Sequence, residues 1–310
     1  MIIDAMNTPL NGIALLPHLG VIRVQGADAA AFLQGQLTQD FALLGLSQAR
    51  LAAFCSAKGR VQATFIGFKR DPQDILLVCS LDLLPAVLKR LSMFVLRAKC
   101  KLTDASSDFQ LRGIAGPALA RLTAEPGEPW SKRDLGAANI IHLYPADGVE
   151  RALWVAPIDE PAPVADTIDT DRWLLAEVHA GVATISAPLV DAFVPQMLNY
   201  ESIGGVNFKK GCYPGQEVVA RSQFRGVLKR RAMLAHCETP MVAGQEIYQR
   251  DDAEQPCGTV VQAARAADDR WDAIVSGQVS AMLSGAIHLG AAVGPALVVR
   301  AMPYPLLDDI

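Results

Sequence analysis

Residues 50–80 read RLAAFCSAKGRVQATFIGFKRDPQDILLVCS, and this stretch decides the fold class. Residues 50–71 are rich in β-branched and aromatic side chains and are interrupted at Lys58-Gly59, so they predict two strands joined by a turn. Residues 74–80 predict a third strand, bounded by Asp and Pro-Gln on one side and Ser on the other. Three successive strands with short connections favour antiparallel pairing.

A helix is expected directly after these strands, within residues 83–99, with Asp82 as its N-cap. Its apolar side chains recur at helical spacing and form one stripe: Leu84, Val87, Leu88, Leu91 and Val95. Three strands followed by a helix are typical of an antiparallel sheet with helices on one face. The sequence therefore predicts the α+β class.

Similar signals flank this unit. Residues 21–26 predict a strand, and a helix capped by Asp28 is expected after it. A strand pair is expected near residues 140–145 and 152–157, because both stretches are short, apolar and bounded by turn residues. Residues 169–182 predict another helix with a largely apolar face.

The sequence pattern changes after residue 226. Short strand-like runs follow one another at regular spacing and are separated by glycine-containing turns, which predicts a small all-β barrel or sandwich over residues 226–310. Residues 1–225 are expected to form two interwoven α+β subdomains, with a boundary near 50–110 for the inserted one. The whole chain thus predicts two α+β units and one β unit.

Composition narrows the functional class. The 310 residues are 51% apolar and 19% charged, and no apolar run approaches the roughly 20 residues that span a bilayer. The first residues lack a basic leader with a cleavage pattern, so the expected compartment is the cytoplasm, without membrane contact. The six cysteines and five histidines form no zinc-type spacing, and no metal site is expected.

Charge is unevenly distributed along the chain. Residues 209–231 carry seven cations and one acid, a net +6, whereas the remainder of the chain carries −10. A basic run in an acidic protein indicates a local anionic ligand. It is also typical of a solvent-exposed edge strand whose charges prevent pairing with another chain. RNA phosphates are a further alternative, although Phe224 is the only aromatic side chain within residues 221–231 that could stack on a base.

The stretch KKGCYPGQEVVAR, residues 209–221, contains the strongest candidate for chemistry. Cys212 lies between Gly211 and Gly215, which permit a sharp turn and a close approach of a ligand. Lys209 and Lys210 would favour the thiolate. The alternative is a tight turn with an inert cysteine, the commoner state of a free thiol.

The helix expected over residues 169–182 carries the second candidate group, with Asp171 as the expected cap. Trp173 near its start could be a platform for an aromatic ring or an ordinary core residue. Glu177 follows at i+4 on the same face and would suit a heterocycle with donor edges. His179 alone favours a structural or exposed role.

Residues 210–221 form the pattern K-G-C-Y-x-G-Q-E-x-x-A-R, which resembles the signature of the YgfZ family. These are folate-binding proteins related to the aminomethyltransferase (T-protein) of the glycine cleavage system. Four further segments resemble the family in the same order: GADAAAFLQGQLTQD, SAKGRVQATF, RWLLAEVHAG and FVPQMLNYESIGGVNFKKG. The resemblance covers nearly the whole chain and implies a three-domain T-protein-like architecture around a central opening.

The resemblance also implies a function and a set of site residues. It implies tetrahydrofolate as cofactor, and a role in assembly or repair of iron–sulfur enzymes, including enzymes that modify tRNA. Partners would be folate and iron–sulfur enzymes or cluster assembly proteins, with tRNA contacted indirectly. By motif, Cys212 is the functional thiol, and Lys210 lies beside the acidic tail of the folate or orients the loop. The other expected folate contacts are Trp173, Glu177, His179, Arg221, Tyr213, Gly215 and Gln216.

Two departures from the relatives bear on activity. The transferases carry an Asp-Asp pair where this chain has Gln62 and Ala63, so no carboxylate is expected there for acid–base catalysis. Their pterin-binding glutamate corresponds to His179, and Glu177 is the expected substitute. Aminomethyl transfer is therefore not expected. A folate-dependent one-carbon transferase and a direct tRNA binder remain the alternatives to an accessory protein.

Overall fold

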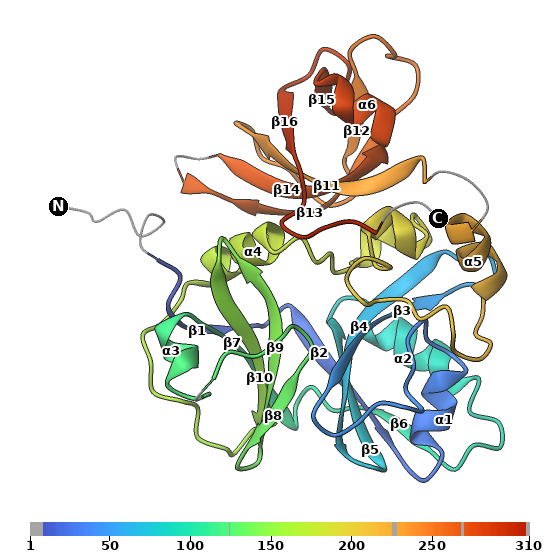
Figure 1. Cartoon of the computed structure of the whole chain (residues 1–310), viewed down its shortest axis with the longest axis vertical. Helices are drawn as coiled ribbons and strands as arrows, with labels where there is room; N and C mark the ends of the chain where they lie inside the picture. The colour runs from blue at the N-terminus through green and yellow to red at the C-terminus, as the bar shows by residue number, and fades with distance from the viewer. Residues whose placement is uncertain (1–8, 124, 225–227, 268–269, 308–310) are drawn as a thin grey trace.

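A computed structural model of the chain describes residues 9–123, 125–224, 228–267 and 270–307. Two five-stranded sheets lie side by side, and a closed six-stranded barrel lies above them in Figure 1. Every strand pairing between named strands is antiparallel. The predicted α+β class and the predicted C-terminal barrel are both confirmed.

The first sheet is built around residues 50–80 and has the strand order β3-β4-β5-β2-β6. Its strands are β2 (Leu19–Gln25), β3 (Ala49–Cys55), β4 (Val61–Asp71), β5 (Asp74–Ser80) and β6 (Lys101–Asp104). β5 begins and ends at the predicted residues. The sheet starts at residue 19 rather than near residue 50, because β2 pairs with both β5 and β6. Helices α1 (Ala29–Gln34) and α2 (Leu84–Ser92) belong to this unit.

The second sheet has the order β1-β7-β10-β9-β8. Its strands are β1 (Gly12–Leu15), β7 (Phe109–Ala115), β8 (Lys132–Leu135), β9 (Ala138–Ala146) and β10 (Val149–Pro157), with helix α3 (Pro117–Ala120) beside β7. The chain contributes β1 to this sheet, leaves to form the first sheet, and then returns. This path makes the two sheets interwoven, and the strand pair expected near residues 140–145 and 152–157 is β9 and β10.

The connection to the barrel carries the segments that form the candidate sites. It contains α4 (Thr170–His179), two 3-10 turns, η1 (Ala187–Leu189) and η2 (Pro195–Leu198), and α5 (Gln216–Phe224). α4 packs against two barrel strands, and α5 packs against η2. In Figure 1, α4 lies under the barrel and α5 lies at the right-hand side.

The barrel closes in the order β11-β14-β13-β12-β15-β16. Its strands are β11 (Arg230–Cys237), β12 (Glu246–Gln249), β13 (Gly258–Arg265), β14 (Trp271–Gln278), β15 (Ile287–Leu289) and β16 (Ala296–Arg300), with helix α6 (Val279–Ser284) after β14. Its interior is a separate apolar cluster that includes Met241, Ile247 and Val275. The barrel therefore has a core of its own.

The three expected aspartate caps were wrong. The carboxylate of Asp28 accepts a hydrogen bond from the backbone N–H of Lys99 at 2.7 Å and makes no bond to α1. That of Asp82 accepts from Ser80 and from the N–H of Ala187 instead of capping α2. Helix α4 is capped by Asp169, not Asp171. Asp28 occupies the N-cap position of α1, but its carboxylate and that of Asp82 each bind another donor. Asp171 lies inside α4 rather than before it.

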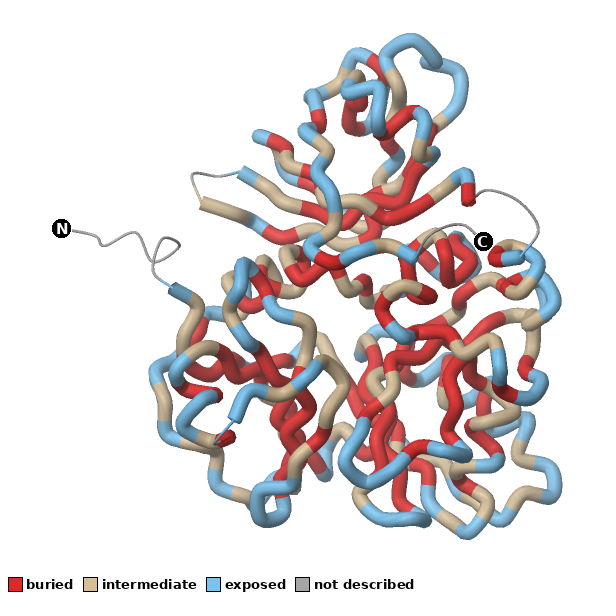
Figure 2. Tube along the Cα trace, viewed as in Figure 1, coloured by how far each residue is buried: buried red, intermediate tan, exposed pale blue. Residues whose placement is uncertain are grey.

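Helix α2 is also shorter than expected. It ends at Ser92, although the apolar spacing continues to Val95. Leu84, Val87 and Leu91 are buried, and Val95, beyond the end of the helix, still packs against the same core, so the apolar stripe extends past the last helical turn. Figure 2 shows the buried residues concentrated inside the sheets and the barrel. No helix within the described ranges is long and apolar enough to cross a bilayer.

Candidate functional site

The loop that carries Cys212 is held against the turn between β3 and β4. Gly215 has φ of +78°, and a Cβ added there would lie 2.4 Å from the carbonyl oxygen of Ser56 and 2.6 Å from Cα of Gly59. Only glycine permits this backbone-to-backbone contact. Gly211, by contrast, faces open space, so its lack of a side chain is not needed for packing.

Lys210 ties the same loop to the first sheet's helix. Its ammonium donates to the carbonyl oxygens of Gln34 and Leu37, at the C-terminal end of α1, and lies 4.8 Å from the centroid of the Tyr213 ring. Burial lowers its pKa to about 8. Carbonyls at a helix C-terminus attract cations, so this arrangement fits the expected loop-orienting role of Lys210.

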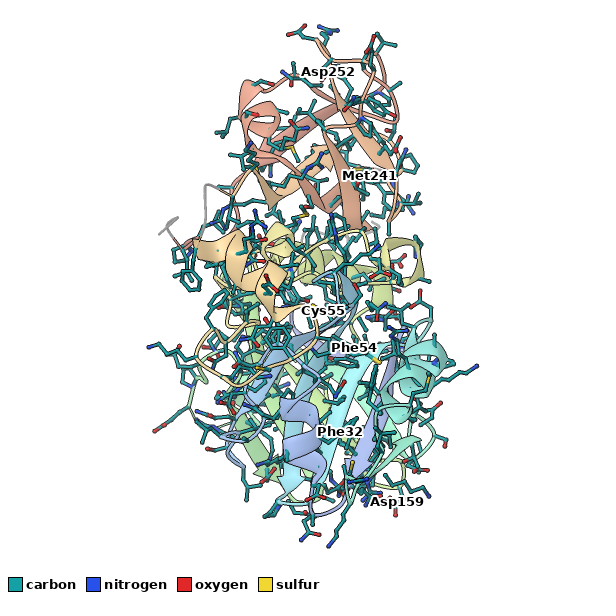
Figure 3. All side chains as sticks on the ribbon, turned by 90° about the vertical axis from the view of Figure 1, so that its right-hand side faces the viewer. Phe32, Phe54, Cys55, Asp159, Met241 and Asp252 are labelled. Carbon is teal, nitrogen blue, oxygen red and sulfur yellow. The ribbon has the colours of Figure 1, made fainter. Side chains whose placement is uncertain are left out.

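Cys212 itself reaches solvent. All six cysteines lie in the described part of the chain, and Cys212 alone is exposed, whereas Cys55 lies inside the molecule beside Phe54 (Figure 3). Burial raises the pKa of Cys55 and of Cys79 to about 12. Cys212 lines neither the inner nor the outer chamber of the central cavity described below.

A central cavity lies where the two sheets, α4 and the barrel meet. Its inner chamber, of about 50 Å³, is walled mainly by apolar residues of the two sheets. Its outer chamber, of about 700 Å³, opens between His18, α4 and barrel residues such as Val261 and Trp271. Glu177 and Thr184 line both chambers and lie between them.

Glu177 is held by groups from three parts of the chain. Its Oε1 accepts from the indole N–H of Trp173 at 2.9 Å and lies 3.5 Å from Nε2 of His18. Its Oε2 accepts from the Gln262 amide of the barrel at 3.2 Å. Burial would raise the pKa of Glu177, but the approach of His18, the charge of Arg151 and the indole bond outweigh it, and the pKa is lowered. The carboxylate is therefore charged at neutral pH.

Trp173 is a wall of the inner chamber rather than an open platform. Its side chain is fully buried, and its ring fits against Gly113, where a Cβ would lie 2.4 Å from Cζ2. The guanidinium of Arg151 covers the ring at 5.0 Å from its centroid. No ring face of Trp173 is exposed for stacking, so its contribution to the cavity is to orient Glu177.

His179 points away from this cavity. It lies two residues after Glu177, about 200° further round the helix. Its Nδ1 lies 2.6 Å from Asp147 Oδ2, in the turn between β9 and β10, and its Nε2 lies 2.6 Å from Asp272 Oδ2 in β14. The relatives carry a pterin-binding glutamate at the position of His179. Here Glu177, and not His179, lines the cavity, so the only carboxylate that this helix turns toward it is that of Glu177.

The remaining motif residues support the Cys212 loop rather than the central cavity. The Gln216 side chain accepts from the N–H of Tyr213 at 3.3 Å, and the Tyr213 ring is buried under Lys210. Arg221 is exposed on α5. None of these residues lines the inner or the outer chamber.

The basic run is dispersed rather than gathered at one ligand. Lys210 is bound to α1, and Arg231 forms a buried ion pair with Glu201 at 2.7 Å. Lys229 and Arg230 line a separate cavity beside α5, and Arg225 lies outside the described residues. None of the described members of this run lines the central cavity.

The position expected to lack a carboxylate has one nearby. Ala63 is buried, but the Gln62 amide donates to Oδ2 of Asp191 at 3.4 Å. Asp191 comes from the segment after η1 and has φ of +62°. It is exposed and does not line the central cavity, so it does not reproduce a buried Asp pair.

Comparisons with known proteins place the chain in a family. No family model matches it. An uncharacterized protein of Haemophilus influenzae is 30% identical over 264 residues, which cover 84% of this chain and 87% of that protein. A protein of Yersinia pestis named tRNA-modifying protein YgfZ is 28% identical over 312 residues, covering 95% of this chain and 92% of that protein. The chain belongs to the YgfZ family.

The fold of this YgfZ-family chain is that of the T-protein. The crystal structure of the glycine cleavage system aminomethyltransferase T from Bartonella henselae superposes with a TM-score of 0.68 and 15% identity. The match covers 97% of this chain and 88% of that one. At this level of identity the likeness concerns architecture, and the three-domain arrangement expected from the sequence is confirmed.

Sequence reasoning missed the partners of Glu177. His18 lies in the turn before β2, and Gln262 lies in β13, 85 residues after Glu177. Neither belongs to a local motif, and a lone histidine or glutamine carries no spacing signal. Only the packing of α4 against the barrel brings them together.

We expect Cys212 to react with iodoacetamide at about pH 8 much faster than Cys55 or Cys79. A pKa of about 12 leaves roughly one thiolate in ten thousand for each buried residue at that pH. Mass spectrometry of peptides from briefly labelled, folded protein measures the rates, with fully labelled unfolded protein as the reference. Equal and slow labelling of all three would contradict an accessible thiol.

The contacts of His179 predict a pH-dependent stability. Both ring nitrogens face carboxylate oxygens, which only accept, so both must carry protons. Burial opposes this charge, but the bonds to Asp272 and Asp147 outweigh it and raise the pKa of His179. The stabilisation is therefore fully present below the unfolded pKa of about 6.5 and is lost as pH rises through the higher folded value.

We expect His179→Gln to lower the free energy of unfolding by about 1–2 kcal/mol near pH 6, and by clearly less near pH 9. Urea unfolding of both proteins at the two pH values measures this. Asp272→Asn should reduce this pH dependence, because it deletes one of the two carboxylates and leaves Asp147 in place. A loss that stays constant between the two pH values would rule out the charged imidazole.

Proposed function

We propose that this YgfZ-family chain is a tetrahydrofolate-binding accessory protein that supports the assembly or repair of iron–sulfur enzymes, including tRNA-modifying ones. The single observation that carries the folate half is the charged carboxylate of Glu177 between the two chambers of the central cavity. The T-protein fold supports a folate ligand in this place. The printed name of the Yersinia relative, a tRNA-modifying protein, supports the link to tRNA.

The residues of the central cavity fit a pterin-like group. The outer chamber has about 700 Å³, within the range of small-molecule sites. Nδ1 of His18 is buried and has no hydrogen-bond partner within the described residues, so this wall offers a polar atom that a ligand could satisfy. Each oxygen of Glu177 can accept further hydrogen bonds beyond those it makes.

The chain's own residues would bind and orient the ligand. Glu177 would accept N–H groups of the pterin, with Gln262 and Trp173 fixing its carboxylate and His18 closing the same wall. Apolar residues such as Leu174 and Val261 would exclude water from the ring. Bound tetrahydrofolate supplies a carrier of one-carbon units.

Cys212 is the proposed point of contact with the iron–sulfur client. The contacts of Gly215 and Lys210 hold its loop in place, and the thiol reaches solvent. An exposed, held thiol is suited to exchange with a sulfur or to ligate a cluster of a partner. Cys212 does not line the central cavity, so folate would act on this contact through the fold and not by touching the sulfur.

A one-carbon transferase is the second candidate, and Asp191 beside Gln62 is the observation that favours it. The exposure of Asp191 outside the central cavity weighs against it, because general acid–base catalysis requires the group within reach of the ligand. A direct tRNA binder, the third, would need the cations to share one surface. Lys210 and Arg231 are instead buried against protein partners.

We expect reduced folate to change the tryptophan fluorescence saturably, because Trp173 and Trp271 line the two chambers. Glu177→Gln should weaken binding about tenfold, the effect of losing one charge-assisted hydrogen bond of roughly 1.4 kcal/mol. Glu217→Gln, an exposed site on α5, is the matched control and should bind normally. Absence of saturation with folded wild-type protein would refute the folate site.

We expect Cys212→Ser to retain the fold and folate affinity but to fail in restoring tRNA methylthiolation in a strain that lacks this protein. Cys100→Ser, which removes a half-buried thiol, should restore it. Mass spectrometry of tRNA nucleosides measures the modification, and circular dichroism checks the fold. Full restoration by Cys212→Ser would remove the thiol from the proposal and leave folate binding untouched.

A further inference from the structure

A second cavity, of about 930 Å³, lies between α5, the η2 turn and one end of the barrel. It is lined by residues at the start of β11, at the end of β14 and at the start of α6. It shares no lining residue with the central cavity. Trp271 lines the outer chamber and Gln278 lines the second cavity, and these residues are the two ends of β14, about 20 Å apart.

The charge of this second cavity is positive and uncompensated. Lys229, Arg230 and Arg231 line it, and none of its described lining residues is acidic. Arg231 is neutralised by Glu201. Neither Lys229 nor Arg230 has a carboxylate within ion-pair distance among the described residues, and Arg230 makes a long bond of 3.4 Å to the carbonyl oxygen of Cys257. Two cations are thus available to an anion.

A buried acceptor in the same wall lacks a donor. Gln196 is fully buried, and its Nε2 donates to the carbonyl oxygen of Val219 at 2.7 Å, which fixes the orientation of the amide. Its Oε1 has no hydrogen-bond partner in the described structure. A buried acceptor without a donor is destabilising, so an N–H donor on a ligand would be favoured there.

The rest of the lining suits a flat, largely apolar body. Met197, Leu228 and Val279 contribute apolar surface, and Ser222 and Ser280 contribute hydroxyl groups. A ligand that satisfies every wall must combine an anionic group, an apolar ring and an N–H donor on that ring. A carboxylate or an inorganic anion alone would leave Gln196 and the apolar wall without a partner.

We propose that this second cavity binds a nucleoside monophosphate. Its phosphate, with a charge close to −2, would be matched by the two free cations Lys229 and Arg230, and the guanidinium fork of Arg230 suits phosphate oxygens. The base would lie on Met197 and Leu228 and donate an N–H to Gln196. The nucleotide is either free or part of an RNA chain. This inference is independent of the folate proposal, because the two cavities are separate.

Calorimetric titration of the full chain with guanosine 5′-monophosphate tests the site. We expect saturable binding that the double variant Lys229→Ala/Arg230→Ala weakens at least tenfold, since each charged contact contributes roughly 1.4 kcal/mol or more. Lys89→Ala/Arg90→Ala removes an exposed Lys-Arg pair on α2 and should leave binding unchanged.

A pair of tryptophan variants tests whether the ligand occupies this cavity, independently of the cationic side chains. Ser280→Trp places a ring at an exposed position of the lining and should abolish binding, whereas Ser284→Trp, at the other end of α6 and outside the lining, should not. Circular dichroism and thermal unfolding check that both variants fold. Binding that survives Ser280→Trp in a folded protein would overturn the assignment to this cavity.

Three further ligands define the chemistry. Guanosine, inorganic phosphate and triglutamate should each bind at least tenfold more weakly than the monophosphate, and equal binding of any one would overturn the nucleotide class. No saturable binding of the monophosphate would overturn the proposal as a whole. A short RNA that competes with it and loses binding in Ser280→Trp identifies RNA as the source, and lack of competition identifies the free nucleotide.

Discussion

The charge of Glu177, whose side chain is only 17% exposed, constrains how the first sheet, α4 and the barrel are arranged. A carboxylate removed from water must be compensated by hydrogen bonds and opposite charge. Here the compensation comes from Trp173 in the same helix, His18 before β2, and Gln262 in the barrel. The barrel, α4 and the first sheet must therefore be in register before this charge is satisfied. The central cavity is a product of that register.

Local signals were sufficient for much of the fold. β5 matched residues 74–80 because an apolar run was bounded by turn residues, and the barrel was visible in the spacing of its short strands. The aspartate caps failed because a carboxylate binds whichever donor tertiary structure brings near it. Asp28 is bound by Lys99, 71 residues away. The predicted end of α2 was too late, because the apolar spacing continues to Val95 although the helix ends at Ser92.

In the candidate sites, too, the features contained in a short stretch of sequence were predictable and those that depend on tertiary contacts were not. The Cys212 loop was recognisable because its signals, Gly215 above all, are contained in one short stretch. The central cavity was only half recognisable. Glu177 was singled out, but its partners come from three separate segments. The basic run does not form one anion site, because neighbouring residues in a helix and a strand point in different directions. Lys210 and Arg231 are bound to protein groups, whereas Lys229 and Arg230 line a separate cavity.

Closure of the C-terminal barrel has a consequence for proteostasis. With all six strands paired on both sides, the barrel presents no open edge that could recruit a strand from another chain. Edge-to-edge growth would have to start from the N-terminal sheets. Two of the four outer strands there, β6 and β8, are each four residues long and include charged side chains such as Lys101 and Arg133. The other two, β1 and β3, are mainly apolar, so open edges capable of recruiting a strand are confined to the N-terminal sheets.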